Sequence, residues 1–278
     1  MAVHRSAADF LARHLASLDA EMPGLLMRVG RQSDPEAIHD LRVAIRRLRT
    51  LLRLARPIYG RHHTDLIRGV YTDVGRSSGA LRDEEVFLEL LEKHGADLSP
   101  PLAPELAGFR DQRLVREREL RGAVLKSLET DDIAVARTLL GALLALPVRP
   151  KKDRDLAKFG RAAVIDSLSA VDEHRDAKGD DGEGLHDLRI AYKRLRYTLE
   201  FFGPVLPPDL TAAHDAAVKF QKRLGDIHDL DMALAHCEAS PQLSGELRGI
   251  LAQSFGEARS KKLAAFEAEM RPDGSRAR

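Results

Sequence analysis

Apolar residues recur every three or four positions along most of the chain, and no segment alternates apolar and polar residues as a half-buried strand would. This periodicity predicts helices separated by breaks rich in Pro, Gly, Ser or Asp. The expected helices cover residues 6–22, 37–57, 61–94, 104–128, 131–146, 155–175, 185–202, 209–239 and 245–270. We expect the third of them to be interrupted near Ser77-Ser78-Gly79. The pattern therefore predicts an all-α protein.

The helix expected at residues 37–57 has two distinct surfaces. At about 100° per residue, one group of basic side chains falls within a single arc roughly 80° wide. This arginine row consists of His39, Arg42, Arg46, Arg49 and Arg53. A broader apolar arc beside it consists of Leu41, Ala44, Ile45, Leu48, Leu51, Leu52 and Ala55. The row contains no acid and has apolar residues on both sides, which favours the wall of a groove between helices over a solvated face. Because like charges three and four positions apart repel, the row indicates a binding site for an anion.

Much of this segment recurs in the second half of the chain. The stretch AIHDLRVAIRRLRTLLRLARP at residues 37–57 is matched by GLHDLRIAYKRLRYTLEFFGP at residues 184–204. The second basic arc consists of His186, Arg189, Lys193 and Arg196. Glu200 occupies the position that corresponds to Arg53, so this second row is shorter or partly neutralised. Other bases also recur at matched positions: Arg76 with Lys222, Arg113 with Arg259, and Arg116 with Lys262. The sequence therefore predicts an internal duplication, with one repeat in residues 1–150 and the other in residues 151–278.

The composition limits the kinds of binding site that the protein can form and its location in the cell. Of the 44 basic residues, 33 are Arg, which can bind a phosphate or carboxylate through two parallel hydrogen bonds. Cys237 is the only cysteine, which excludes an intrachain disulfide and a zinc site built from several cysteines. The longest apolar run, Leu139–Val148, is too short to span a bilayer, which takes roughly 20 residues. Residues 1–24 carry acids and lack a continuous apolar core, unlike a secretory signal. We therefore expect a cytoplasmic protein.

Two motifs resemble those of a known family. The pattern H-D-[LF]-R-[VI]-x-x-[KR]-R-L-R is present at His39–Arg49 and again at His186–Arg196. Segments of the form G-x-x-[RH]-D follow at Gly79–Asp83 and Gly225–Asp229. Both motifs resemble the CHAD domain (conserved histidine α-helical domain), and the match covers nearly the whole chain.

The resemblance implies an all-α fold of two pseudo-symmetric antiparallel four-helix bundles around a central basic channel, the two repeats together forming one CHAD domain. It also implies binding of inorganic polyphosphate, and some members of the family localise to polyphosphate granules. The family is often fused to a CYTH triphosphatase domain, but the E-x-E-x-K motif does not occur in this chain. We therefore expect a stand-alone CHAD protein.

Polyphosphate is a ligand that suits the basic side chains of the two rows. It is a flexible polyanion with about one negative charge per unit and no bases, so a binder needs many Arg, Lys and His donors and no aromatic stacking platform. The low aromatic content of 5% is consistent with this. We expect binding without turnover, with no cofactor and no metal, by His39, Arg42, Arg46, Arg49, Arg53, Arg76, Arg113, Arg116, His186, Arg189, Lys193, Arg196, Lys222, Arg259 and Lys262. His39 and His186 lie near predicted helix N-termini, whose unpaired backbone N–H groups favour anions.

Two other functions stay open at this point. Three His-Asp dipeptides, at residues 39–40, 186–187 and 228–229, allow an HD-like metal-dependent phosphohydrolase. However, none of the 11 histidines lies three or four residues from another, which is the usual ligand spacing on a helix. The rows would also suit a less specific nucleic-acid or polyanion binder, although the sequence contains no recognisable helix-turn-helix and few aromatic residues for reading bases.

Overall fold

The computed structural model describes residues 6–31, 34, 36–96, 99–148, 153–179 and 181–270, and the structural statements below concern these residues. Their regular secondary structure is helical, apart from one isolated bridge between Ser6 and Asp155. This confirms the predicted all-α class. No helix within these ranges is both long enough and apolar enough to cross a membrane. The tail expected after Met270 lies outside the described residues.

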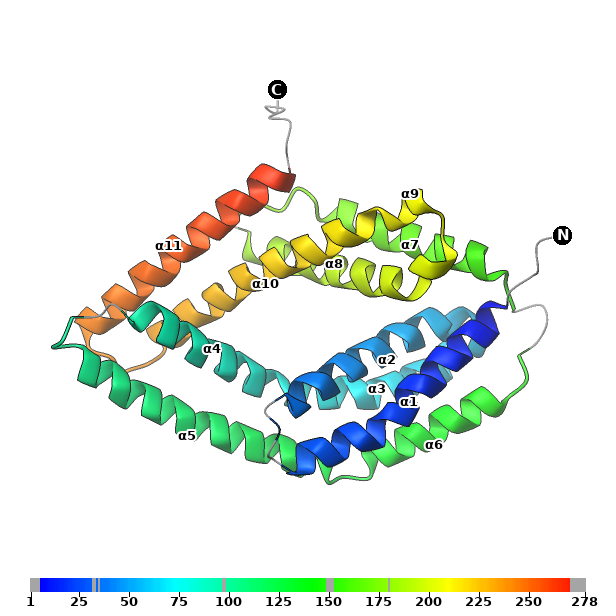
Figure 1. Cartoon of the computed structure of the whole chain (residues 1–278), viewed down its shortest axis with the longest axis horizontal. Helices are drawn as coiled ribbons and strands as arrows, with labels where there is room; N and C mark the ends of the chain where they lie inside the picture. Colours follow the sequence, from blue (N-terminus) through cyan, green and yellow to red (C-terminus); the bar gives the residue numbers. More distant parts are fainter. Residues whose placement is uncertain are drawn as a thin grey trace. The chain divides into compact units, whose positions relative to one another are not determined.

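Most helices begin and end within a few residues of their predicted bounds (Figure 1). In chain order they are α1 (Ala7–Arg31), α2 (Ala37–Tyr59), α3 (Arg61–Ser77), α4 (Gly79–Gly95), α5 (Ala103–Leu128), α6 (Asp132–Ala145), α7 (Leu156–Glu173), α8 (Gly182–Phe202), the 3₁₀ turn η1 (Gly203–Val205), α9 (Pro208–Thr211), α10 (Ala213–Glu238) and α11 (Gly245–Met270). The interruption expected near Ser77-Ser78-Gly79 separates α3 from α4. A further break, which was not predicted, divides the segment at residues 209–239 between α9 and α10.

The prediction that the first helix ends before Pro23 is wrong. The helix begins as expected, since the Oγ atom of Ser6 accepts a hydrogen bond of 3.0 Å from the backbone N–H of Asp9. It then continues through Pro23 to Arg31. A proline inside a helix removes one backbone hydrogen bond and crowds the preceding turn. Packing on both sides outweighs this cost, because Met22 is 0% exposed and Val29 is 3% exposed.

The chain folds into two compact units, and each unit contains segments from both halves of the sequence. Unit 1 consists of Met1–Ala80, Leu120–Ser169 and Arg194–His214. Unit 2 consists of Leu81–Glu119, Ala170–Lys193 and Asp215–Arg278. The expected repeats, at residues 1–150 and 151–278, are a different division of the chain. Their boundaries, their pseudo-symmetry and the central channel stay predictions.

A four-helix bundle forms within unit 1. Helix α1 packs against α2, α2 against α3, α3 against α6, and α6 against α1, which closes the ring. Neighbouring helices of this ring run in opposite directions (Figure 1). All residues of the predicted apolar arc of α2 are buried, and Leu48, Leu51, Leu52 and Ala55 are fully buried. Burying one Leu side chain contributes about 1.5–3 kcal/mol, so this face fixes the rotation of α2 about its axis and thereby the direction of the arginine row.

The core of unit 2 is built from α4, α5, α10 and α11 and the segments that join them. Its buried cluster consists of Phe87, Leu91, Leu102, Leu106, Phe109, Leu230, Ala233, Cys237, Leu243, Leu247, Leu251 and Phe255. The rings of Phe87 and Phe109 meet edge to face with their centroids 6.2 Å apart. Cys237 is fully buried in this cluster, and burial raises the pKa of its thiol to about 11. The single cysteine of the chain is therefore a core residue.

Candidate anion-binding site

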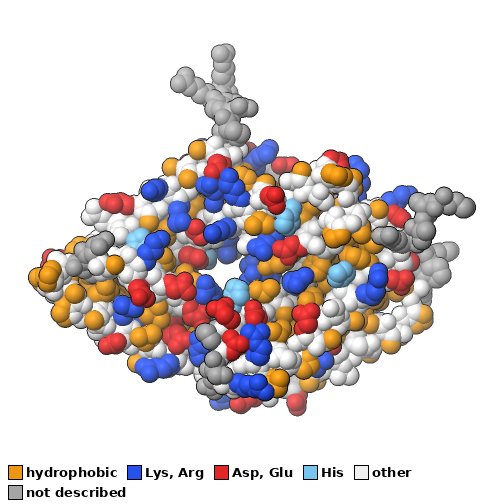
Figure 2. Space-filling model, viewed as in Figure 1, with side chains coloured by type: hydrophobic (Ala, Val, Ile, Leu, Met, Phe, Trp, Pro, Cys, Tyr) orange, Lys and Arg blue, Asp and Glu red, His pale blue; other side chains and the backbone are white. Residues whose placement is uncertain are grey.

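Basic and acidic side chains are interspersed over the face of the molecule drawn in Figure 2. This agrees with the formal net charge of +1. A surface of mixed charge does not by itself locate a polyanion site, so the partners of each basic side chain decide which of them are available to a ligand.

The fold of unit 1 places the arginine row beside the buried face of α2. Arg42, Arg46, Arg49 and Arg53 are all half-buried, while His39 is exposed in the first turn. Partial burial is what a narrow row between apolar flanks predicts, because aliphatic stems pack while the charged ends reach outward. The row is therefore part of a packed surface and is not a fully solvated helix face.

Neutral oxygen atoms orient two members of the row. The Nη1 atom of Arg42 donates to the Oγ atom of Ser78 at 2.7 Å and to the carbonyl oxygen of Gly75 at 3.3 Å. The Nη1 atom of Arg46 donates to the hydroxyl oxygen of Tyr197 at 2.9 Å, and its guanidinium lies 5.8 Å from the centre of that ring. These partners hold the guanidinium groups in place without adding a negative charge.

Arg49 and Arg53 lie in surroundings that disfavour their positive charge. Burial lowers the pKa of Arg49, the nearby charges of Arg68, Arg46 and Arg76 lower it further, and the charge of Asp73 opposes them. The Nε atom of Arg49 is buried and has no hydrogen-bond partner among the described residues. For Arg53, burial lowers the pKa to about 10, with the charge of Arg194 as the next cause. These guanidinium groups are partly desolvated and crowded by like charge, which an added anion would relieve.

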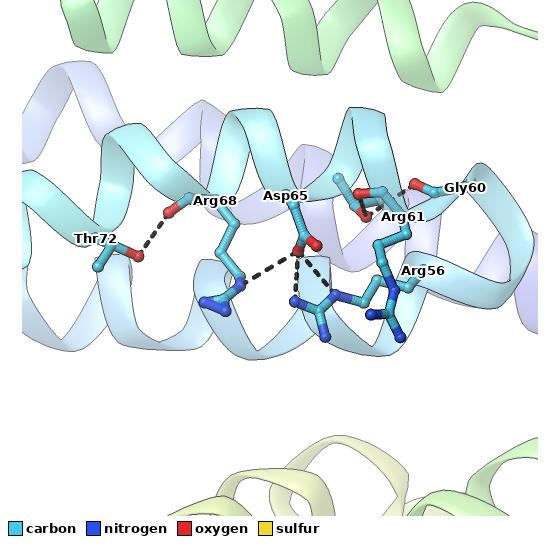
Figure 3. Close-up of polar contacts among 7 residues, drawn as sticks. Arg56, Gly60, Arg61, Asp65, Arg68 and Thr72 are labelled. Atoms are coloured by element: carbon cyan, nitrogen blue, oxygen red, sulfur yellow. Dashed lines mark hydrogen bonds and ion pairs between the residues drawn. The ribbon is translucent and has the colours of Figure 1, made fainter.

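Arg56 near the end of α2 and Arg68 on α3 are further basic residues that were not predicted to be part of the site (Figure 3). The Nε and Nη2 atoms of Arg56 donate to Oδ1 of Asp65 at 2.8 Å and 2.5 Å. The Nε atom of Arg68 lies 3.7 Å from the same oxygen. One carboxylate thus anchors two guanidinium groups and leaves a net positive charge. The sequence could have indicated a basic face on α3, because Arg61 and Arg68 are seven positions apart and therefore lie on one face of the helix.

Arg76 lies near the C-terminal end of α3 and is mostly exposed. Its Nη1 atom is 3.3 Å from Oδ1 of Asp73, and about three quarters of each side chain is accessible to solvent, at 78% and 73%. An exposed pair of this kind contributes little to stability. Arg76 is therefore available to a ligand, and its charge adds to the field at Arg49.

The second basic arc, on α8, is divided between the two units. In unit 1, the Nε atom of Arg196 donates to Oε1 of Glu200 at 2.7 Å, so the acid that replaces the last arginine partly neutralises this row. In unit 2, Arg189 approaches Nδ1 of the exposed His186 at 3.5 Å, and Lys193 is half-buried. The predicted row on α8 thus carries less net charge than the row on α2.

Most of the remaining predicted bases in unit 2 already have acidic partners. Arg113 forms two hydrogen bonds to the buried Glu84, of 2.6 Å and 2.5 Å, and lies 5.0 Å from the ring centre of Phe87. Arg259 is bonded to Asp231 and also donates to the carbonyl oxygen of Gly179 at 3.2 Å. The other pairs are Lys262 with Asp226 at 2.6 Å and Arg116 with Glu119 at 3.2 Å, while Lys222 is exposed.

The His-Asp dipeptide at residues 228–229 has perturbed acid–base properties. Burial raises the pKa of Asp229 to about 6, and the charge of Arg189 opposes that rise. Burial also lowers the pKa of His228, as do the charges of Arg189 and His186. The rings of His186 and His228 are 5.8 Å apart. No group of three or more His, Cys, Asp or Glu side chains in the described part of the chain is arranged to hold a metal ion.

Two solved structures share this fold. The crystal structure of the CHAD domain from the plant Ricinus communis matches with a TM-score of 0.77 and 22% sequence identity, covering 98% of this chain and 92% of that chain. PptA from Streptomyces chartreusis matches with a TM-score of 0.71 and 16% identity, covering 96% of this chain and 99% of that chain. No curated protein sequence matches this chain significantly. The family model of the CHAD domain matches residues 9–238, so this chain belongs to the CHAD domain family, as its two motifs predict.

Proposed function

We propose that this protein binds inorganic polyphosphate along the arginine row of α2, without turnover. The observation that supports the proposal best is the crowding of Arg49. This guanidinium is partly buried, surrounded by Arg46, Arg68 and Arg76, and has a lowered pKa. A bound polyanion would stabilise such a cluster, because each negative charge replaces a repulsion with an attraction.

Polyphosphate suits this row better than other anions do. A guanidinium can bridge two oxygens of one phosphate or of neighbouring phosphates, and successive arginines three or four positions apart follow a chain along the helix. The neutral hydrogen-bond acceptors of Arg42 and Arg46 preorganise these donors. The CHAD domain family is linked to polyphosphate binding and metabolism, which supports the same ligand.

The other predicted residues would contribute unequally. His39 is exposed in the first turn of α2, where backbone N–H groups also favour an anion. Arg113 is bonded to a buried carboxylate, so a phosphate would have to displace Glu84 before it could use that guanidinium. We therefore propose the row on α2, together with Arg68 and Arg76, as the main contact. We also propose that the protein associates with polyphosphate granules in the cytoplasm.

The proposal is tested by removing two charges from the row. Arg46→Ala combined with Arg49→Ala should weaken binding of long-chain polyphosphate by at least about 10²-fold, since each hydrogen bond to a charged group contributes about 1.5–3 kcal/mol. The slope of log affinity against log salt concentration should become shallower by about 0.7 for each lost contact. Affinity is measured by calorimetry at several salt concentrations, and circular dichroism checks that the helices are intact.

Arg13→Ala is the matched control, because Arg13 is an exposed arginine of α1 outside the row. It removes one arginine charge from outside the row and should leave the affinity within about twofold. If the double variant and the control bind polyphosphate equally well at matched salt, the row is not the site.

Two further measurements separate polyphosphate binding from the alternative functions. Release of inorganic phosphate from polyphosphate is followed for hours with Mg²⁺, Mn²⁺ or Zn²⁺ present. Steady release that Asp229→Asn abolishes would replace the proposal with metal-dependent hydrolysis. In competition, duplex DNA or RNA at equal phosphate concentration should not displace long-chain polyphosphate; displacement would indicate a general polyanion binder.

A further inference from the structure

Lysine residues are concentrated at one pocket of unit 2. The pocket has a volume of about 550 Å³ and lies among the end of α4, the first half of α10 and the second half of α11. Its lining contains six basic side chains and one acid: Lys93, Lys219, Lys222, Arg223, Lys261, Lys262 and Asp226. Five of the 11 lysines of the chain are therefore at this lysine pocket, although the chain contains 33 arginines.

Three of these ammonium groups have no acidic partner within the described part of the chain. Lys262 is bonded to Asp226 at 2.6 Å, and both Lys219 and Arg223 are bonded to Glu269. Lys93, Lys222 and Lys261 are exposed, and none of them has a hydrogen bond or ion pair with another described residue. The pocket therefore keeps an excess of positive charge after its internal pairs are formed.

The shape and the residue type point to a compact anion. A volume of about 550 Å³ is within the range of roughly 300–1,000 Å³ that is usual for small-ligand sites. A lysine ammonium is a compact point charge with three rotatable donors, whereas arginine presents a flat fork. Lysines around a hollow suit a small group with concentrated charge, while a row of arginines on a helix suits a long chain.

The end of a polyphosphate chain is such a group. A terminal phosphate has a second ionisation with a pKa of about 6, as phosphate monoesters do, so at neutral pH it carries more charge than an internal phosphate. We infer that the lysine pocket binds the terminal phosphates of a linear oligophosphate or polyphosphate. The inference rests on the proposed function for the class of ligand, but its site is formed by other residues. Lys222 and Lys262 were expected to bind polyphosphate; Lys93, Lys219, Arg223 and Lys261 are additional.

The test compares two small phosphates that differ in having chain ends. Linear tripolyphosphate has two terminal phosphates, and cyclic trimetaphosphate has only internal ones. Wild-type protein should bind the linear compound at least about tenfold more tightly in calorimetry at near-physiological salt. Equal affinities would overturn the chain-end site, and so would undetectable binding of both compounds.

Variants then locate the site. Lys222→Gln combined with Lys261→Gln should weaken tripolyphosphate binding by at least about tenfold. Lys126→Gln combined with Lys158→Gln is the matched control, because both lysines are exposed and lie outside the pocket. Acetylation of wild-type protein gives a readout without mutation: tripolyphosphate should protect Lys93, Lys222 and Lys261 and leave Lys126 and Lys158 reactive. Equal loss in both double variants, or equal protection of all five lysines, would overturn the assignment.

The test of the lysine pocket can fail or succeed independently of the test of the arginine row. Arg46→Ala with Arg49→Ala should weaken long-chain binding and leave the affinity for tripolyphosphate within about twofold. If these arginine changes have no effect on long chains while the lysine changes abolish tripolyphosphate binding, the proposed function of the row fails and the lysine pocket stands. If the arginine changes abolish tripolyphosphate binding as well, the pocket is not an independent site.

Discussion

The arginine row of unit 1 and the paired bases of unit 2 have opposite electrostatic surroundings. In unit 1, Arg46 is bonded to a neutral hydroxyl group, and the pKa of Arg49 is lowered first by burial and then by the charges of neighbouring arginines. In unit 2, Arg113, Arg259 and Lys262 are each bonded to a carboxylate. The paired bases are neutralised by carboxylates of the protein itself, whereas the charge of the row would be compensated mainly by the anion that we propose binds there.

This difference separates two roles that look alike in the sequence. Arg113 and Arg259 recur at matched positions in the two halves, just as the two basic rows do. The recurrence of a basic residue in both halves therefore does not show whether that residue binds a ligand or stabilises the fold. The presence of an acid on the neighbouring helix distinguishes the two roles, and four predictions test that distinction.

The largest expected effect is the loss of the buried acid in unit 2. Glu84→Ala leaves Arg113 largely buried without its partner, since the two side chains are only 4% and 18% exposed. Breaking a buried pair in this way costs about 3–5 kcal/mol, measured as the free energy of unfolding in urea. Glu119→Ala is the control, because it removes the exposed partner of Arg116 and should cost less than about 1 kcal/mol. Similar losses in the two variants would show that the Glu84 pair is not structural.

Replacing one arginine in each unit should change stability in opposite directions. Arg49→Met removes a half-buried charge from a cluster of like charges and should raise the free energy of unfolding by about 0.5 kcal/mol, because solvent screens part of the repulsion. Arg259→Met leaves Asp231 without its partner and should lower it by about 1 kcal/mol. Chemical denaturation of the two variants measures both values. A loss of stability with Arg49→Met would contradict the crowding of the row.

A smaller effect, visible as a pH dependence, is expected at Asp229. Burial raises the pKa of this carboxyl to about 6, above its value in the unfolded chain. The folded protein then binds more protons than the unfolded chain between about pH 4 and 6, so this group favours folding at low pH and loses that contribution as pH rises through 6. Asp229→Asn should therefore raise the melting temperature more at pH 7.5 than at pH 5. An equal shift at both pH values would show that the carboxyl titrates normally.

The smallest effect is expected at the contact between α3 and the row. A Cβ atom at Gly75 would lie 3.3 Å from the Nη1 atom of Arg49, and that neighbour is the flexible end of a side chain. Gly75→Ala should stabilise α3 by a few tenths of a kcal/mol, about 0.3–0.8, because alanine favours a helix more than glycine does. It should also lower polyphosphate affinity by about twofold by displacing the guanidinium. Calorimetry and thermal melting measure the two effects, and unchanged affinity would mean that the guanidinium moves without consequence.

Much of the fold was predictable because a helix period is a local property. The bounds of α2 and the burial of its apolar arc follow from residues within one segment, and so does the break between α3 and α4. The extension of α1 through Pro23 was not predictable, because it depends on what Met22 and Val29 pack against. The same is true of Ile190, an apolar residue of α8 that is 49% exposed.

The candidate site was predictable only in part. The row itself follows from spacing on one helix, but its neighbours come from distant segments, as Tyr197 does for Arg46. The carboxylate that neutralises Arg113 lies 29 residues away, and nothing in the spacing of Glu84 marks it as a partner. Pairing between helices depends on packing, so a single sequence identifies the charged positions but not their partners.

The burial of Cys237 makes the chain's only thiol a natural reporter of folding. In the folded protein this thiol is 0% exposed and stays protonated at neutral pH, because burial raises its pKa to about 11. A thiol reagent added to native protein therefore reacts only when the core of unit 2 opens. The rate of labelling measures the opening of that unit directly, and a cysteine introduced on the surface of unit 1 would accept a fluorophore without competition from a second exposed thiol.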